Sequence, residues 1–256
     1  MHAKIKEILQ YKKAELRKQK QELPLATLKL HVRQSKADFL SAFDASRVGL
    51  IAEVKFASPT HPNLGTKTCL EDRIIAYEKG NAVAISVITE PHFFQGELEV
   101  IRQVKKLTQL PVLQKDFVID EYQVYQAAYL GADALLFIAR IVSQDDLVKL
   151  IDLALELGIE PVVEIFLERE LTKALTTSTR VIAVNARDLD TFQIDKQRAT
   201  QLLTTIPQNY LKLGFSGVET RDDVTSYHKA GAQGVLVGTV LMQASDPAKK
   251  LAELQL

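Results

Sequence analysis

The sequence predicts a single (β/α)8 barrel preceded by an N-terminal helical extension. The chain has 256 residues, which is the usual size of one such barrel. Eight short runs, apolar almost throughout, alternate with stretches of helical character, as in parallel strands that are buried on both faces. No GxGxxG motif follows the first run, which favours a closed barrel over an open dinucleotide-binding sheet.

Each apolar run is followed by a polar loop and a helical stretch. The predicted strands are residues 48–54, 82–88, 111–114, 132–138, 159–165, 180–185, 211–215 and 234–238. The clearest helical stretches are residues 70–79, 121–130, 143–157, 167–175 and 222–230. Several helices end near a glycine that suits the left-handed conformation of a helix end, which we expect for Gly80, Gly131, Gly158 and Gly231.

Residues 1–47 form the predicted extension and residues 48–256 the barrel, with no linker or second domain. Ile5, Ile8, Leu9 and Leu16 recur near helical spacing among charged residues, which predicts an amphipathic helix over the first twenty residues. A second short helix is expected over residues 37–43. Both precede the first strand, so we expect them to pack onto the barrel.

Composition excludes several classes of protein. Lys plus Arg and Asp plus Glu both total 32, so net charge gives no reason to expect nucleic acid or a membrane as partner. The single cysteine, Cys69, excludes an internal disulfide, and no CxxC or HExxH spacing suggests a metal site. The N-terminus lacks the apolar core of a signal peptide, and no stretch reaches the ~20 apolar residues of a membrane span. We therefore expect a cytoplasmic enzyme.

Active sites of such barrels lie where the strands end, and four of these positions carry charge. Glu53 and Lys55 are two residues apart at the end of the first strand, so both side chains point to the same side. Lys115 ends the third strand and Glu164 the fifth. For the first two taken alone, a structural ion pair that closes the barrel core is an alternative to a functional role. Four charges at one mouth are better explained as proton donors and acceptors, because mutual burial shifts their pKa values.

Further polar and aromatic residues follow other strands. Asn185 ends the sixth strand with Arg187 just beyond it, and Ser216 ends the seventh. Three phenylalanines after the second and third strands suit either the wall of an apolar pocket or packing under a loop: Phe93, Phe94 and Phe117.

Small residues after the seventh and eighth strands suggest a phosphate site. Gly217, Gly238 and Thr239 lie there, and Ser58 follows Lys55 in the first loop. Barrels often bind phosphate at this place, because small residues let backbone N–H groups approach the anion. Simple turn formation explains the glycines equally well.

Eight segments resemble, in order and spacing, the signatures of the indole-3-glycerol phosphate synthase family. They are AEVKFASPT, FFQGELEVIRQVK, PVLQKDFVID, GADALLFIA, VVEIF, VNARDLDTF, FSGV and LVGTVLM. The EVK…SP and QKDFVID segments are the most specific, especially in combination with the N-RDL pattern. The resemblance runs from about Ile5 to the C-terminus and covers nearly the whole chain.

The resemblance implies a step of tryptophan biosynthesis. The family converts 1-(2-carboxyphenylamino)-1-deoxyribulose 5-phosphate to indole-3-glycerol phosphate, releasing carbon dioxide and water without a metal or organic cofactor. We therefore expect no cofactor, a small phosphorylated substrate as partner, neither nucleic acid nor membrane, and a monomer or weak homodimer.

The resemblance also implies roles for the strand-end residues. Lys115 matches the general acid of ring closure, Glu164 a proton-transfer group, and Glu53 with Lys55 a pair implicated in dehydration and in binding the substrate carboxylate. The matching catalytic positions are Glu53, Lys55, Lys115, Glu164, Asn185 and Ser216. The matching phosphate positions are Lys55, Ser58, Gly217, Gly238 and Thr239. The matching ring positions are Phe117, Leu136, Arg187 and Leu189.

Three phenylalanines depart from the family pattern. Phe56 stands where a lysine or arginine is usual, Phe166 replaces the histidine of VEVH, and Phe215 replaces the glutamate of ESG. The six catalytic positions are retained, so we expect an active but atypical enzyme. The alternatives are another phosphate-binding barrel, such as a sugar-phosphate isomerase or an aldolase, and a catalytically weakened paralogue with an interaction role.

Overall fold

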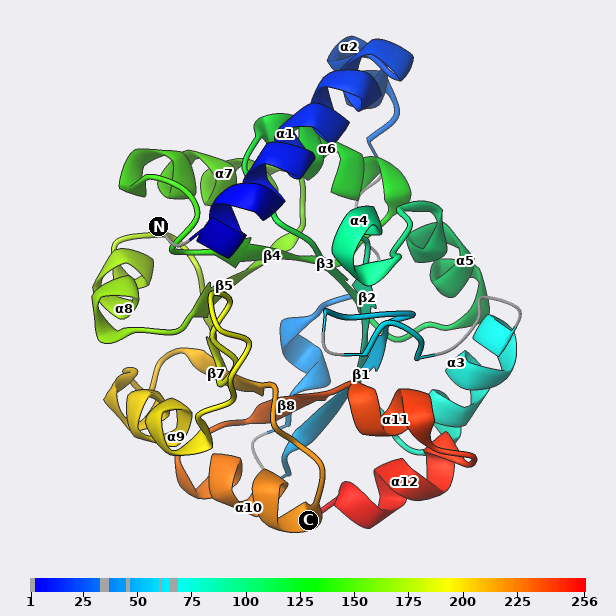
Figure 1. Ribbon diagram of the computed structural model, residues 1–256, viewed down its shortest axis with the longest axis vertical. Helices are drawn as coiled ribbons and strands as arrows, with labels where there is room; N and C mark the ends of the chain where they lie inside the picture. Colours follow the sequence, from blue (N-terminus) through cyan, green and yellow to red (C-terminus); the bar gives the residue numbers. More distant parts are fainter. Residues whose placement is uncertain (1–2, 33–36, 45–46, 60, 65–68) are drawn as a thin grey trace.

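The computed structural model describes residues 3–32, 37–44, 47–59, 61–64 and 69–256. Its centre is a closed barrel of eight parallel strands, each paired with its neighbour in chain order (Figure 1). The strands are β1 (Gly49–Val54), β2 (Ala84–Ile88), β3 (Val112–Lys115), β4 (Ala134–Ile138), β5 (Glu160–Ile165), β6 (Val181–Asn185), β7 (Leu211–Phe215) and β8 (Gly234–Val237). The predicted fold class is confirmed, and every predicted strand is present to within two residues at either end.

Helices surround the barrel and connect its strands (Figure 1). They are α1 (Ala3–Glu22), α2 (Leu25–Leu30), η1 (Leu40–Ala42), α3 (Leu70–Lys79), α4 (Pro91–Phe94), α5 (Glu99–Leu107), α6 (Glu121–Leu130), α7 (Gln144–Glu156), α8 (Glu168–Leu175), α9 (Lys196–Thr205), α10 (Arg221–Lys229), α11 (Thr239–Gln243) and α12 (Pro247–Leu254). None of these described helices combines the length and the apolar composition that crossing a membrane requires.

Alternation along each strand divides the apolar residues into two cores. Ile51 and Leu113 point into the barrel and pack there with residues of the other strands. Leu50, Ala52 and Val54 point outward and pack against the surrounding helices. Burial on both faces explains why the strands read as continuous apolar runs. The same alternation directs Glu53 to the inner side of β1.

The N-terminal extension contacts both ends of the barrel. The helix α1 lies across the loops that follow β3 and β4, where Lys12 forms an ion pair with Asp116 (Figure 1). At the opposite end Phe43 reaches beneath the barrel, where its ring would overlap a Cβ on Gly49 or Gly234. Phe43 can therefore pack against the starts of β1 and β8 only because glycine occupies these two positions.

Two local predictions were wrong. Residues 37–43 contain one 3₁₀ turn, η1, rather than a helix, because Phe39 and Phe43 turn inward to join the interior core. The helix α2, which the sequence pattern did not reveal, lies earlier in the extension.

The second wrong prediction concerns Gly80, which has φ −81° and not the left-handed conformation seen at Gly131, Gly158 and Gly231. Its small size is instead required by Leu251 of α12, whose side chain lies 2.7 Å from an ideal Cβ at this position.

Candidate active site

The carboxyl ends of the strands enclose two adjoining chambers. The first, which we call the polar chamber, is lined by Glu53, Lys55, Ser58, Arg187, Ser216, Gly217, Gly238 and Thr239, among others. The second, which we call the apolar chamber, is lined by Phe94, Phe117, Leu136, Ile138, Glu164 and Leu189, among others. Five residues line both chambers and so lie at their boundary: Ile88, Phe94, Leu189 and, as the polar members, Lys115 and Asn185.

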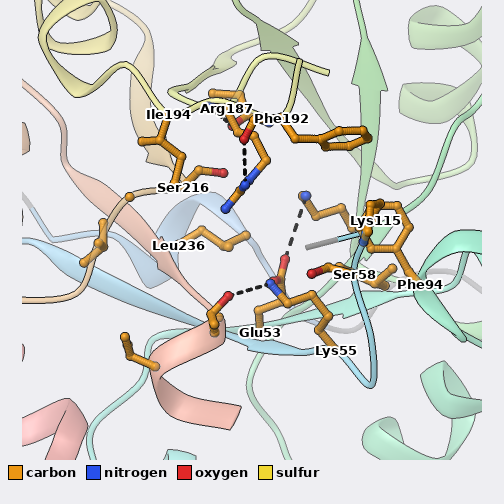
Figure 2. Close-up of a pocket in the computed structure, with 18 of the residues that line it drawn as sticks. Glu53, Lys55, Ser58, Phe94, Lys115, Arg187, Phe192, Ile194, Ser216 and Leu236 are labelled. Atoms are coloured by element: carbon orange, nitrogen blue, oxygen red, sulfur yellow. Dashed lines mark hydrogen bonds and ion pairs between the residues drawn. The ribbon is translucent and has the colours of Figure 1, made fainter. Parts of the chain in front are cut away.

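Glu53 lies between the two lysines that the sequence singled out (Figure 2). Its Oε1 is 3.0 Å from the Nζ of Lys55, and its Oε2 is 3.8 Å from the Nζ of Lys115. Burial opposes ionisation of this carboxyl, but Lys55, Lys115 and Arg187 together lower its pKa below the ordinary value. Glu53 is therefore a permanently charged group at neutral pH, shared by two ammonium groups.

Glu164 has the opposite electrostatic environment. It is buried on β5, and burial raises its pKa although Lys115 and a hydrogen bond from the Asn185 side chain act against this rise. Its Oε2 atom has no hydrogen-bond partner among the described residues. The site thus pairs one carboxylate held ionised with another whose pKa lies nearer neutrality, which is a common way to divide charge stabilisation from proton transfer.

The loop after β6 carries Arg187 toward the polar chamber (Figure 2). The backbone N–H of Arg187 donates to the Oδ1 of Asn185 at 2.9 Å, and its guanidinium donates to the carbonyl of Phe192, also at 2.9 Å. This bond orients the Asn185 amide with its oxygen toward the loop backbone, and its nitrogen is the donor to Glu164. The sequence reasoning placed both residues at this strand end, and the structure brings them together.

The backbone after β7 has an uncommon conformation. Ser216 and Gly217 have φ angles of +67° and +74°, and the Ser216 side chain lines the polar chamber. A Cβ on Gly217 would lie 3.0 Å from side-chain atoms of both Ile194 and Lys196. Glycine at 217 is therefore required by conformation and by space together, and its position leaves the backbone of this turn facing the chamber.

Glycine is required at position 238 by the ion pair of Glu53 and Lys55. A Cβ there would overlap the carboxylate of Glu53 and lie 3.2 Å from the Nζ of Lys55. The next residue, Thr239, accepts a hydrogen bond at 3.2 Å from the Nζ of Lys55. The start of α11 thus holds the Glu53–Lys55 pair in place from β8, in addition to lining the chamber beside Ser58.

The predicted ring-binding residues divide between the chambers. Phe117 and Leu136 line the apolar chamber, Arg187 lines the polar one, and Leu189 lines both. Phe94 lines both, so of the three phenylalanines after β2 and β3 it joins Phe117 at the site. Phe93 packs instead against Tyr11 and His92.

The three departures from the family pattern have different surroundings. Phe56 is buried in the layer between the strands and the outer helices. Phe215 is buried in the barrel interior at the end of β7. Phe166, just after β5, lies beside the guanidinium groups of Arg140 and Arg198. None of the three carries a charge into the chambers.

Two supporting residues were missed by the sequence reasoning. Glu90 follows β2 and accepts hydrogen bonds from the backbone N–H groups of His92, Phe93 and Phe94, which orients α4 beside the apolar chamber. Lys12 is buried on α1 and lies 2.8 Å from Asp116, the residue after Lys115. The sequence contained a signal for both residues. Glu90 is a carboxylate just after a predicted strand, and Lys12 lies four residues from Ile8 and from Leu16, on the apolar face of the predicted helix.

Comparisons with known proteins identify the family of the chain. The sequence profile of the family described as indole-3-glycerol phosphate synthase matches residues 5–254. The protein of that name from Caldanaerobacter subterraneus subsp. tengcongensis is 39% identical over 242 residues, covering 94% of each chain. The one from Aquifex aeolicus is 34% identical over 252 residues, covering 98% of each chain.

Solved structures share the fold at low sequence identity. A 3-hexulose-6-phosphate synthase superposes with a TM-score of 0.63 and 19% identity, covering 81% of this chain and 98% of that one. A mutant tryptophan synthase alpha-subunit from Pyrococcus furiosus gives a TM-score of 0.60 and 18% identity, covering 80% and 97%. At this level of identity these likenesses show the fold alone, whereas the family profile also matches the N-terminal extension. The chain therefore belongs to the indole-3-glycerol phosphate synthase family.

Proposed function

We propose that this chain is an indole-3-glycerol-phosphate synthase of tryptophan biosynthesis, and that its strand-end charges carry out the proton transfers. It closes the ring of 1-(2-carboxyphenylamino)-1-deoxyribulose 5-phosphate, with loss of carbon dioxide and water. The single observation that carries the assignment of roles is the position of Lys115, whose side chain lines both chambers. A substrate with its phosphate in one chamber and its aromatic ring in the other would bring its ketone to this ammonium group.

The two chambers suit the two ends of the substrate. The polar chamber offers the ammonium of Lys55, the hydroxyls of Ser58 and Ser216, and the open backbone at Gly217 to a phosphate. The apolar chamber offers aromatic and aliphatic walls, including Phe117, to a benzene ring. The guanidinium of Arg187 is a further cation for the substrate's anionic groups.

In ring closure, the aromatic carbon that bears the carboxylate attacks the ketone carbon. Negative charge then develops on the ketone oxygen, and Lys115 donates the proton that neutralises it. Glu53 holds this ammonium in place without competing for the proton, because the pKa of Glu53 is lowered. The carboxylate next leaves as carbon dioxide, and its bonding electrons restore the aromatic ring.

In dehydration, the former ketone oxygen leaves as water and a proton leaves the adjacent ring carbon. Glu164 is the proposed base, since its raised pKa makes it a stronger proton acceptor than an ordinary carboxylate. A lysine ammonium, from Lys115 or Lys55, gives the departing hydroxyl its proton. Asn185 orients Glu164 through the hydrogen bond between their side chains.

The proposed state is a monomer or weak homodimer, because the residues that line both chambers on one chain are sufficient for the proposed chemistry. The proposed partner is the phosphorylated substrate itself, with neither a cofactor nor a nucleic acid. The proposed location is the cytoplasm, as expected for an enzyme that acts on a small phosphorylated intermediate of biosynthesis.

The test is to incubate the purified protein with the carboxyphenylamino sugar phosphate and to follow indole fluorescence. We expect product from the wild-type chain and a large loss for Glu164→Gln and for Lys115→Met. Absence of product from the wild type under all buffer conditions would refute the activity. Wild-type turnover in both variants would refute the assigned roles and leave the activity standing.

A further inference from the structure

Arg198, on α9, continues the pairing of β5 and β6 beyond their last backbone pair. The parallel ladder between these strands ends with Ile165 opposite Val184. Past that point the guanidinium of Arg198 donates one hydrogen bond to the carbonyl of Asn185 at 2.7 Å and another to the carbonyl of Phe166. One planar side chain thus takes the place of the next backbone pair of the ladder. It does so at the ends of the two strands that carry Glu164 and Asn185.

Phe166 provides an aromatic surface for this guanidinium. The Cζ of Arg198 lies 3.5 Å from the centre of the phenylalanine ring, and the Cζ of Arg140 lies 4.8 Å from the same centre. Arg140 is in turn held by Glu170 at 2.9 Å and by Asp188 at 3.2 Å. Phe166 is thereby fixed among charged groups that belong to the loops after β4, β5 and β6.

The guanidinium of Arg198 is held by two carbonyls and a ring instead of by a carboxylate. Its side chain forms no ion pair within 4.0 Å among the described residues, and its Nε is buried without a hydrogen-bond partner there. Burial lowers the pKa of this guanidinium, although nearby carboxylates such as Asp195 oppose the fall. A cation kept half-buried on two carbonyls and a ring costs free energy that an apolar side chain would not. Such a cost is typical of groups retained for a functional geometry.

We propose that Arg198 is a positioning residue that sets the ends of β5 and β6 so that the Asn185 amide reaches the Glu164 carboxyl, with Phe166 as its support. This inference rests on the proposed function, in which Glu164 is the base. Arg198 touches neither chamber, so its effect on the reaction is transmitted through the two backbone carbonyls that it holds.

Arg198→Lys is the decisive variant, because it keeps the charge and removes the fork that binds both carbonyls. Arg169→Lys on α8, an exposed site, is the matched control. The readout is the titration of the Glu164 carboxyl by NMR of protein labelled with ¹³C at the glutamate carboxyl, assigned with Glu164→Gln. The charged groups that act on Glu164 are Lys115, Arg140 and Glu170, and both arginine variants leave them in place.

We expect Arg198→Lys to raise the pKa of Glu164, because the hydrogen bond from Asn185 that lowers it is weakened. In steady-state kinetics we expect kcat to fall about tenfold or more with KM changed less than about threefold, since a misplaced catalytic group costs rate more than binding. The acid limb of the pH–rate profile should move to higher pH. Arg169→Lys should match the wild type in all three measurements.

Phe166→Leu is the second variant, since it removes only the aromatic support and should shift the Glu164 titration in the same direction by a smaller amount. If neither variant moves the titration or kcat, and only the melting temperature falls, Arg198 is merely structural and the inference is overturned. The titration needs no substrate, so it decides this question even for a protein without turnover. Lack of turnover in the wild type would instead overturn the proposed function.

Discussion

Glu164 is predicted to be a residue whose removal makes the protein more stable and less active. Its carboxyl is buried on β5, and burial raises its pKa above the ordinary value of 4.5. A group whose folded-state pKa is raised stabilises the fold below its unfolded pKa and loses that contribution as pH rises through the folded value. At neutral pH the ionised Glu164 therefore weakens the fold, and Glu164→Gln removes this cost.

The increase in the free energy of unfolding of Glu164→Gln follows from the linkage between protonation and folding. Each unit by which the folded-state pKa exceeds the unfolded one costs about 1.4 kcal/mol above both values. A gain of 1 kcal/mol in a chain of this size corresponds to roughly 2–4 °C in melting temperature. Because glutamine is nearly isosteric with glutamate, Glu164→Gln should keep the packing of the apolar chamber while removing the proposed base. We expect kcat to fall about 10²- to 10⁴-fold.

The assay compares melting temperatures of the wild type and Glu164→Gln by circular dichroism across a pH series. The variant should match the wild type near pH 4 and become progressively more stable toward pH 8, with a plateau once Glu164 is ionised in the wild type. Indole fluorescence gives kcat on the same samples. A variant that is less stable than the wild type at pH 8, or a difference that shrinks as pH rises, would refute the reasoning.

Three further variants test the rest of the site. Glu53→Gln should destabilise the fold at pH 7 by about 2–3 kcal/mol, because Lys55, 3.0 Å away, loses its counter-charge. Since the pKa of Glu53 is lowered, this difference should shrink on acidification, which thermal melts will show. Lys115→Met should lower kcat about 10²- to 10⁴-fold with an unchanged circular dichroism spectrum, and wild-type turnover would exclude Lys115 as the acid. Gly238→Ala should cost about 10²-fold in kcat, measured by indole fluorescence, because its Cβ displaces the Glu53 carboxylate; an unaltered kcat would contradict this packing argument.

The barrel and much of its site could be predicted because both depend on local patterns. Apolar runs that alternate with helices determine the order of parallel strands, and the active face follows from the direction of those strands. The spacing of Glu53 and Lys55 placed them on one side of β1, where they form an ion pair. Lys115 and Asn185 were also found from their position, since each is a polar residue at the end of an apolar run.

The remaining features depend on contacts between distant parts of the chain. The segment 37–43 was predicted as a helix, yet Phe43 packs beneath the barrel in the space beside Gly49 and Gly234, which no local pattern reveals. Gly238 resembles an ordinary turn glycine in the sequence, and only the Glu53 carboxylate across the barrel mouth explains it. Arg198 resembles a solvent-exposed residue of a helix, because its carbonyl partners lie 13 and 32 residues earlier.

Phe215 bears on whether the site lacks a necessary group. It lies level with Asn185 of β6 and is buried in the barrel interior, where the family pattern has a glutamate. The two lysines of the site already share one carboxylate, since Glu53 lies 3.0 Å from one ammonium and 3.8 Å from the other. A second carboxylate would compete for these cations, whereas the proposed mechanism uses Lys115 as the proton donor of ring closure and Glu164 as the acceptor of dehydration. Both of these groups are present, so in the proposed mechanism Phe215 changes the electrostatic balance of the site without removing a proton-transfer group.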